Sequence, residues 1–264
     1  MTLQEALDSS GLDCREARLL LAASTGFSEA SVVAFAERAV PSETQQRFAE
    51  FVARRKSGEP VAYILGRKEF YGLELAVNPA VLIPRPETEL LVELSLQKDF
   101  SIAVDLGTGS GAVALALKKN RAQARVVAVE ASAAALVVAR RNAVKHSLDI
   151  DFRHGRWLAP LGDETFDLIV SNPPYVAAGD PHLPKLRFEP SAALVGGADG
   201  LDAIRELARD APARLAAGGW LFLEHGMGQD AAVRGLLAAA GLEEVRSWPD
   251  LAGIPRVSGG RRKI

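Results

Sequence analysis

The spacing of hydrophobic and polar residues differs between the two ends of the chain. In the first part, apolar side chains recur three and four positions apart, which is typical of helices that bury one face. These positions are Leu3, Leu7, Leu19, Leu20, Phe48, Phe51 and Val52. Thr2 with Glu5, and Ser42 with Gln45, match the capping box that begins many helices. The pattern predicts a small helical domain over residues 1–66.

The following stretch, residues 67–84, has the character of a hairpin and a connector. Apolar and aromatic residues flank Tyr71-Gly72, which predicts two short strands joined by a tight turn. Two prolines, Pro84 and Pro86, then make the chain stiff and extended. Because Pro86 also suits the first turn of a helix, we expect the larger domain to begin here, over residues 85–264.

From about residue 90, short apolar runs alternate with helical patterns. The predicted strands cover residues 102–104, 126–129, 166–170 and 220–223, with an edge pair near 243–247 and 255–258; the predicted helices cover about 112–119, 131–146, 200–215 and 228–240. This alternation predicts an α/β fold, with a mostly parallel sheet covered by helices on both faces. Ligands of such sheets bind at the carboxyl ends of the strands.

Composition and charge narrow the possible partners. The chain has 264 residues, 48% hydrophobic and 24% charged, with a formal net charge of -2. Residues 1–84 hold 9 Lys+Arg against 11 Asp+Glu, which leaves 22 against 22 in the remainder. Without a basic excess in either part, direct binding of nucleic acid is not expected.

Cysteine usage and hydropathy suggest the compartment. The single cysteine, Cys14, cannot form a disulfide within the chain, which suits a reducing environment. No apolar run approaches the ~20 residues of a membrane span, and the first residues lack a secretory pattern. A cytoplasmic protein without membrane contact is therefore expected. The histidines, which are His146, His154, His182 and His225, lack the spacing of a metal site, so no metal is expected.

A glycine-rich loop follows the first strand of the larger domain and opens a helix. Its residues are Asp105, Leu106, Gly107, Thr108, Gly109, Ser110 and Gly111. Such a loop brings backbone N–H groups close to a ligand. Glu130 ends the next strand, where an acid can accept both hydroxyls of a ribose. The pattern also satisfies the dinucleotide motif. However, Asp105 would repel a diphosphate and can hold an ammonium group, which favours S-adenosylmethionine.

The segment Asn172-Pro173-Pro174-Tyr175 directly follows the strand predicted over residues 166–170. The prolines fix the backbone, so that the carbonyl of Pro173 and the side-chain oxygen of Asn172 can accept both hydrogens of one NH₂ group. Tyr175 offers a flat face to a planar group. This chemistry suits methylation of an amide or aromatic amine, whose nitrogen needs positioning and electrostatic help to react.

Three alternatives follow from these motifs. The tetrad also serves the exocyclic amines of nucleic acids, so a DNA or RNA adenine-N6 methyltransferase is one. The glycine loop allows a nicotinamide-dependent oxidoreductase as the second. A non-enzymatic cofactor-binding module is the third.

Several segments together resemble the peptide chain release factor glutamine N5-methyltransferase family. They are Pro60 to Gly66, Phe70 to Gly72, Leu82 to Glu89, Asp105 to Gly111, Asn172 to Tyr175, Arg187 to Pro190 and Glu224 to Gly226. The resemblance implies an N-terminal helical, substrate-recognition domain joined by the hairpin to a seven-stranded, Rossmann-like S-adenosylmethionine methyltransferase domain. It implies as substrate the glutamine of the Gly-Gly-Gln motif in release factors.

The resemblance also assigns roles by position. It places Asp105, Gly107, Thr108, Gly109, Ser110 and Gly111 around the methionine part of the cofactor, Glu130 on the ribose, Trp157 near the adenine, and Asn172, Pro173, Pro174 and Tyr175 around the target amide, with Asn172 also near the cofactor. Arg187 and Glu189 lie in a long loop, residues 176–199, that we expect to shape the slot for the substrate glutamine.

Two positions depart from the family pattern. Arg156 stands where the family usually has an acid that bonds the adenine amine, and arginine cannot accept a hydrogen bond. We therefore expect a backbone carbonyl to replace it or the cofactor to bind less tightly. Glu130 replaces the more common aspartate, a tolerable lengthening.

Overall fold

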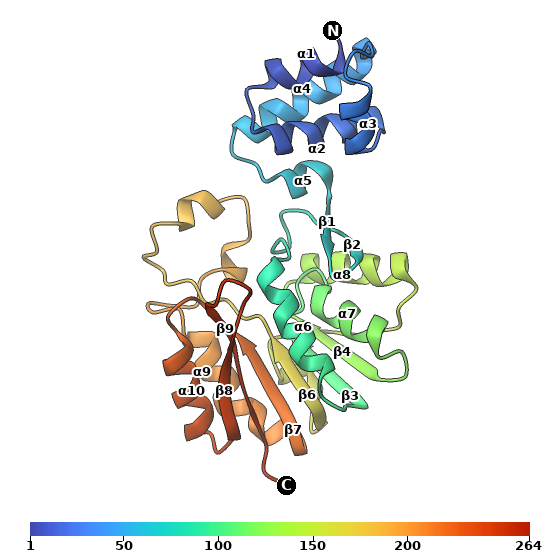
Figure 1. Cartoon of the computed structure of the whole chain (residues 1–264). Helices are drawn as coiled ribbons and strands as arrows, with labels where there is room; N and C mark the ends of the chain where they lie inside the picture. Colours follow the sequence, from blue (N-terminus) through green and yellow to red (C-terminus); the bar gives the residue numbers. More distant parts are fainter. The chain divides into compact units, whose positions relative to one another are not determined.

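The structure is a computed structural model of the whole chain, residues 1–264 (Figure 1). Its contacts divide the chain into two compact units, Met1–Arg67 and Lys68–Ile264. None of the helices is both long enough and apolar enough to cross a membrane.

The first unit consists of helices alone. They are α1 (Leu3–Ser10), α2 (Cys14–Thr25), α3 (Glu29–Ala34), α4 (Ser42–Lys56) and α5 (Val61–Leu65). Their apolar faces meet in one core around Leu3, Leu20 and Phe48, with Leu7, Phe51 and Val52 at its margin. Leu19 was predicted in this core but is only half-buried, and Leu21 takes its place, because the apolar run 19–21 leaves the helical phase ambiguous.

One of the two predicted capping boxes is present. The Thr2 hydroxyl accepts from the backbone N–H of Glu5, and the Glu5 carboxylate accepts from that of Thr2. The prediction for Ser42 is wrong: Pro41 occupies the cap and Ser42 is already helical. The Gln45 side chain instead donates to the carbonyl of Val40 at 2.7 Å, since Pro41 has no backbone N–H for a capping box.

The predicted hairpin is confirmed and, except for its first residue Arg67, belongs to the second unit. It pairs β1 (Arg67–Phe70) with β2 (Leu73–Ala76). Tyr71 and Gly72 both have positive φ, 49° and 70°, which matches the right-handed twist of the two strands. Phe70, Leu73 and Leu75 are buried in the core of the second unit, so the hairpin is anchored by packing and is not a loose linker.

The rest of the second unit is a seven-stranded sheet, in agreement with the expected fold. Its strands are β3 (Ile102–Leu106), β4 (Arg125–Glu130), β5 (Asp151–His154), β6 (Phe166–Ser171), β7 (Leu215–Glu224), β8 (Glu243–Pro249) and β9 (Pro255–Arg261). Their order is β5-β4-β3-β6-β7-β9-β8. The first five strands in this order are parallel, and β9 is antiparallel to both β7 and β8.

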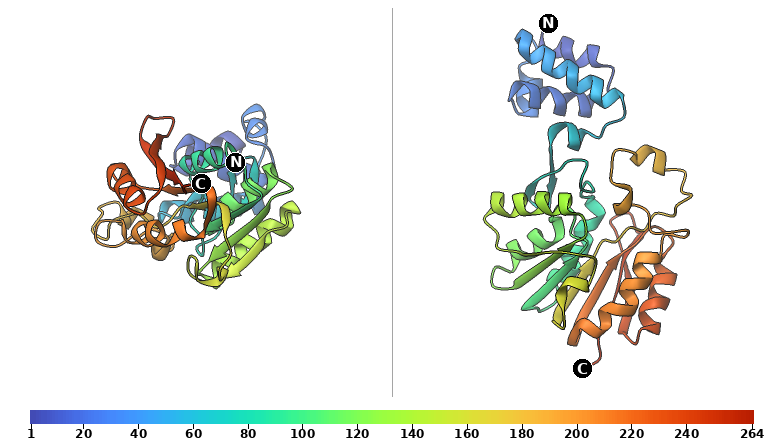
Figure 2. Two further views of the ribbon diagram at one scale, coloured as in Figure 1. Left: turned by 90° about the horizontal axis from the view of Figure 1, so that it is seen from below. Right: turned by 180° about the vertical axis from the view of Figure 1, so that it is seen from behind.

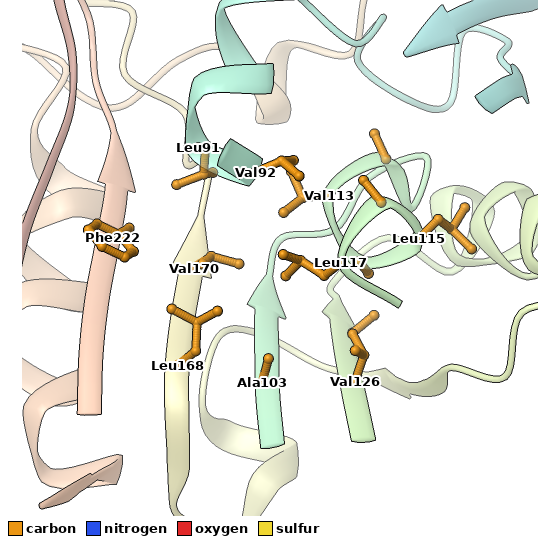
Figure 3. Packing of buried hydrophobic residues seen from close by; sticks show 14 of the residues in the cluster. Leu91, Val92, Ala103, Val113, Leu115, Leu117, Val126, Leu168, Val170 and Phe222 are labelled. Atoms are coloured by element: carbon orange, nitrogen blue, oxygen red, sulfur yellow. The ribbon is translucent and has the colours of Figure 1, made fainter. Parts of the chain in front are cut away.

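Helices cover both faces of this sheet (Figure 2). They are η1 (Pro86–Thr88) leading into α6 (Glu89–Leu96), α7 (Ala112–Asn120) and α8 (Ala133–His146) on one face, and α9 (Asp202–Asp210) with α10 (Asp230–Ala239) on the other. In Figure 3, Leu91 and Val92 of α6 and Leu117 of α7 point toward side chains of the central strands, such as Val170. Full burial of these side chains provides most of the driving force for the layered fold.

A buried asparagine joins the hairpin to this layered core. Asn142 of α8 has no exposed surface. Its Oδ1 accepts from the N–H of Ala76 at 2.7 Å, and its Nδ2 donates to the carbonyls of Ala76 at 3.0 Å and Ser110 at 2.9 Å. One side chain thus holds the hairpin, α8 and the glycine-rich loop together.

We expect Asn142→Asp to destabilise the second unit by about 2–4 kcal/mol, because a carboxylate oxygen would face two carbonyl oxygens without a proton to share. Denaturant unfolding measures this loss. Asn78→Asp is the matched control, since the exposed side chain of Asn78 accepts one bond, from the N–H of Ala80, and a carboxylate can accept it too. Equal stability of the two variants would contradict the role of Asn142.

Candidate functional site

The register of the central strands brings three chain segments to one edge of the sheet. Asp105 of β3 pairs with Ala128 of β4 on one side and with Val170 of β6 on the other. The Ser171 hydroxyl donates to the carbonyl of Leu106 at 2.6 Å, which ties the ends of β6 and β3. The chain runs to β4 and β5 on one side of β3 and then crosses to β6 on the other. This is the switch point at which open α/β sheets bind ligands.

A cavity of about 600 Å³ opens at this edge, a size typical of small-molecule sites. It is lined by predicted site residues Asp105, Gly107, Thr108, Gly109, Ser110, Glu130, Trp157, Asn172 and Pro174, together with Thr88, Arg156 and part of the segment 190–203. The structure therefore brings the glycine loop, the acid that ends β4 and two residues of the Asn-Pro-Pro-Tyr tetrad to one pocket. The predicted residues Gly111, Pro173, Tyr175, Arg187 and Glu189 do not line it.

The glycine loop turns back under the cavity with left-handed backbone angles. Gly107, Gly109 and Gly111 have φ of 77°, 57° and 85°. A Cβ on Gly107 would lie 3.0 Å from the ring of Trp157, so the bare backbone there lets the indole close over the loop. Gly111 is the N-cap of α7 and packs against Leu115, so it supports the helix and does not face the cavity.

Asp105 is a buried carboxylate without a cationic neighbour. It is only 2% exposed, and its Oδ2 accepts from the Thr108 hydroxyl at 2.6 Å and from the N–H of Ala114 at 3.2 Å. Burial raises the pKa of Asp105 to about 6, against the lowering effect of these two donors. Glu130 adds to the raised pKa by its charge, and no positive side chain opposes it.

Glu130 ties the loop to the end of β4. Its Oε2 accepts from the N–H of Gly109 at 2.8 Å, and its Oε1 accepts from the N–H of Ser132 at 2.8 Å. A carboxylate oxygen can accept a second bond, so each oxygen retains capacity for a hydroxyl group. The half-buried position at the cavity wall suits that use.

Trp157 and Arg156 form the wall beyond β5. Trp157 has a φ of 46°, uncommon for a non-glycine residue, and its buried indole N–H has no hydrogen-bond partner. Arg156 is one of the two residues that depart from the family pattern. Its guanidinium forms an ion pair with Glu206 of α9. The pairing leaves the aromatic ring as the main feature of this wall.

The residues of the tetrad after β6 make different contacts. The Nδ2 of Asn172 donates to the Thr88 hydroxyl at 3.1 Å, while the residue lines the cavity. Pro173 is buried. The Tyr175 hydroxyl donates to the carboxylate of Glu224 at 3.2 Å, and burial raises the pKa of Tyr175. The expected stacking of Tyr175 on the substrate stays a prediction; in the structure its half-buried ring packs against the hydrophobic core on one side of the sheet.

The long loop contributes to the cavity through other residues than those predicted. Glu189 is buried, and its carboxylate accepts from the N–H of Ile83 at 3.1 Å and pairs with Arg85 at 2.5 Å. It therefore holds the proline connector. The Arg187 guanidinium lies over the ring of Phe188, 5.0 Å from its centre. Neither residue lines the cavity, whereas Pro190 and several residues after it do; the expected part of Arg187 and Glu189 in binding the substrate glutamine stays a prediction.

Several residues that line the cavity or support the tetrad were not predicted from the sequence. Thr88 and Glu224 lie in motifs that carried the family resemblance, but nothing in those motifs shows that they meet the tetrad. Gly196 and Gly200 pack on its backbone: a Cβ would lie 2.3 Å from the carbonyl oxygen of Pro174 and 2.1 Å from that of Tyr175. The glycines at positions 196, 197 and 200 were the sequence feature that could have indicated this close backbone packing.

Comparison with known proteins decides the family. The model of the Methyltransferase small domain matches residues 86–184, and that of the PrmC N-terminal domain matches residues 2–66. A release factor glutamine methyltransferase of Neisseria gonorrhoeae is 48% identical over 267 residues, which cover 99% of this chain and 98% of that protein. One of Burkholderia pseudomallei is 48% identical, with 98% and 96% covered.

The chain belongs to the release factor glutamine methyltransferase family. This confirms the interpretation as a methyltransferase, with S-adenosylmethionine as cofactor, and the oxidoreductase and non-enzymatic alternatives are wrong. Solved structures agree on the fold. A methyltransferase of Pyrococcus furiosus has a TM-score of 0.59 at 18% identity, covering 82% of this chain and 100% of its own.

The cavity of this methyltransferase fits its cofactor in chemical terms. The buried carboxylate of Asp105 lacks a cation, and the amino acid end of the cofactor carries an ammonium group. Glu130 has acceptor capacity for ribose hydroxyls, and the ring of Trp157 offers a flat apolar wall for adenine. When bound, the cofactor supplies a methyl group on a positively charged sulfur.

We expect Asp105→Asn to weaken cofactor binding at least ~10-fold and also to stabilise the enzyme at pH 8. The folded-state pKa of about 6 lies above the unfolded value of 3.8. The stabilisation by the protonated acid is therefore complete below the unfolded value and is lost as pH rises through about 6. Removing the charge should recover about 1–3 kcal/mol at pH 8.

Calorimetry measures the affinity, and denaturant unfolding at pH 4 and pH 8 measures the stability. The exposed Asp149, changed to asparagine, is the matched control and should leave both unchanged. A variant at Asp105 that binds the cofactor like the wild type would show that its carboxylate does not hold the ammonium group.

Proposed function

We propose that this enzyme transfers the methyl group of S-adenosylmethionine to the side-chain amide nitrogen, N5, of the glutamine in the Gly-Gly-Gln motif of peptide chain release factors. The observation that carries the proposal is the orientation of Asn172. Its Nδ2 is engaged by Thr88, and the residue lines the same cavity as Asp105 and Glu130. Its Oδ1 is thus left to accept a hydrogen bond from a substrate.

An amide nitrogen is a poor nucleophile because its lone pair is delocalised into the carbonyl. Acceptance of both N–H bonds by the Asn172 side chain and the Pro173 carbonyl would raise electron density on the nitrogen and fix the direction of attack. In the transfer, a nitrogen–carbon bond forms as the sulfur–carbon bond breaks. The sulfur leaves as a neutral thioether, and the positively charged, methylated nitrogen gives up one proton to solvent water.

The helical unit over residues 1–66 is proposed to recognise the release factor. Two large apolar side chains, Val33 and Phe35, are 51% and 54% exposed on this unit and offer contact area for a protein partner. Since release factors act on ribosomes, we place the enzyme in the cytoplasm. Its near-neutral charge supports a protein substrate without direct binding of nucleic acid.

Labelled cofactor tests the substrate. The enzyme is incubated with S-adenosylmethionine carrying a radioactive methyl group and either a release factor or DNA. Label is expected in the release factor, at the glutamine of the motif. Label in DNA alone would instead favour an amino methyltransferase acting on adenine.

We expect Asn172→Ala to lower the transfer rate by an amount equivalent to about 2–4 kcal/mol of transition-state stabilisation, because one preorganised acceptor is lost. Single-turnover kinetics with bound cofactor measure the rate directly. The control is Asn120→Ala, at the exposed end of α7, which should keep the wild-type rate. Full activity of the Asn172 variant would show that the tetrad is structural only.

A further inference from the structure

A second layer of polar side chains lies behind Asn172. Glu224, at the end of β7, is 1% exposed, and its Oε1 accepts from the Tyr175 hydroxyl. Its Oε2 is fully buried and completes no hydrogen bond. Thr88 is 4% exposed, and its hydroxyl faces the same carboxyl group and lowers its pKa. A buried carboxylate oxygen without a donor is costly, and the Thr88 hydrogen is the donor at hand.

We propose that Thr88 and Glu224 are positioning residues that fix which way the amide of Asn172 faces. The Glu224 carboxylate draws the hydroxyl hydrogen of Thr88, so the Thr88 oxygen can only accept from Asn172. Asn172 must then turn its Nδ2 to Thr88 and its Oδ1 to the cavity. The inference rests on the proposed function, because an outward oxygen is useful only to a substrate that donates an N–H.

The direction of one hydroxyl decides this arrangement. A threonine hydroxyl both donates and accepts, and an asparagine amide can present either end. If the Thr88 hydroxyl donated to Asn172, the amide would turn and present its Nδ2 to the cavity. Two NH₂ groups would then face each other across the substrate contact. An anion behind Thr88 excludes that state, since the hydroxyl hydrogen is held by the negative charge.

The charge state of Glu224 determines the pH range in which Thr88 holds the Asn172 amide in this orientation. Burial raises the pKa of Glu224 to about 7, the charge of Glu87 raises it further, and Thr88, Tyr175 and the charge of Arg256 lower it. In the next residue, just past the end of the strand, burial lowers the pKa of the His225 ring. Above about pH 7 the carboxylate accepts from Thr88. Below it, the protonated acid can donate to Thr88 and release the hydroxyl hydrogen toward Asn172.

The test compares Thr88→Val with Thr88→Ser. Valine keeps the shape and removes the hydroxyl, whereas serine keeps the hydroxyl. We expect Thr88→Val to lower kcat for release factor methylation by ~10- to 100-fold, with the cofactor Kd within about twofold of the wild type. Thr88→Ser should recover most of the rate. A purely structural role for Thr88 would instead move stability and Kd together.

Two further readouts separate positioning from packing. The carboxyl carbon of Glu224, followed by NMR in the enzyme without cofactor, should titrate at higher pH in Thr88→Val, because the donor that lowers its pKa is gone. Glu224→Gln should lower kcat and abolish the rise of the wild-type rate through about pH 7. We expect the Glu224→Gln variant to fold, since glutamine buries no charge at this position.

The outcomes are distinct. If the wild type does not methylate the release factor, the proposed function fails, and the Glu224 titration still tests the contact. If the wild type is active and Thr88→Val keeps its kcat with an unmoved Glu224 titration, the inference is overturned. A pH dependence that persists unchanged in Glu224→Gln also overturns it, even where Thr88→Val does not fold.

Discussion

The register of β3 against its two neighbours is the constraint on which the site depends. Since Asp105 stands level with Ala128 and Val170, the strands on both sides end at one height, and the segments that follow them meet. A shift by one residue would reverse which face each side chain points to. The hydrogen bond from Ser171 to Leu106 holds this register where the strands part. The pairing of the strands therefore determines where the loops that carry the site residues begin.

Buried polar groups then lock the loops onto that edge. Asn142 ties the hairpin to the glycine loop, and Glu189 ties the proline connector to the long loop. The acids Asp105 and Glu224 lie deeper and have raised pKa values because burial disfavours their charged forms. Such acids reduce the stability of the fold at neutral pH, a cost that is typical of sites where a ligand or a catalytic group needs their charge. In this enzyme Asp105 lines the cavity that fits the cofactor, and Glu224 lies behind Asn172, the residue proposed to bind the substrate.

Much of the fold could be predicted from sequence, because buried parallel strands are near-continuous apolar runs. The exceptions have local causes. β5, with the sequence Asp-Phe-Arg-His, was not predicted because it lacks an apolar run. It lies at the edge of the sheet, where polar side chains remain accessible and form ion pairs such as that of Arg153 with Asp151. The beginning of β7 contains Gly218 and Gly219, which resemble a loop in sequence.

The site was predictable to the extent that its residues follow strands directly. Asp105, Glu130 and Asn172 lie where strand ends place them, so their meeting follows from topology. The pairings of Glu189 with Arg85 and of Thr88 with Asn172 join residues far apart in the chain. No spacing rule encodes such contacts, and for that reason Glu189 was expected at the substrate slot and Thr88 was given no role.

The most direct test is a crystal structure of the enzyme with S-adenosylhomocysteine and a release factor that carries the Gly-Gly-Gln motif. The glutamine nitrogen is predicted to lie within about 3.2 Å of the Asn172 Oδ1 and to face the thioether sulfur. An Asn172 that presents its Nδ2 to the glutamine, or a glutamine bound away from the cavity beside Asp105 and Glu130, would contradict the proposed catalysis.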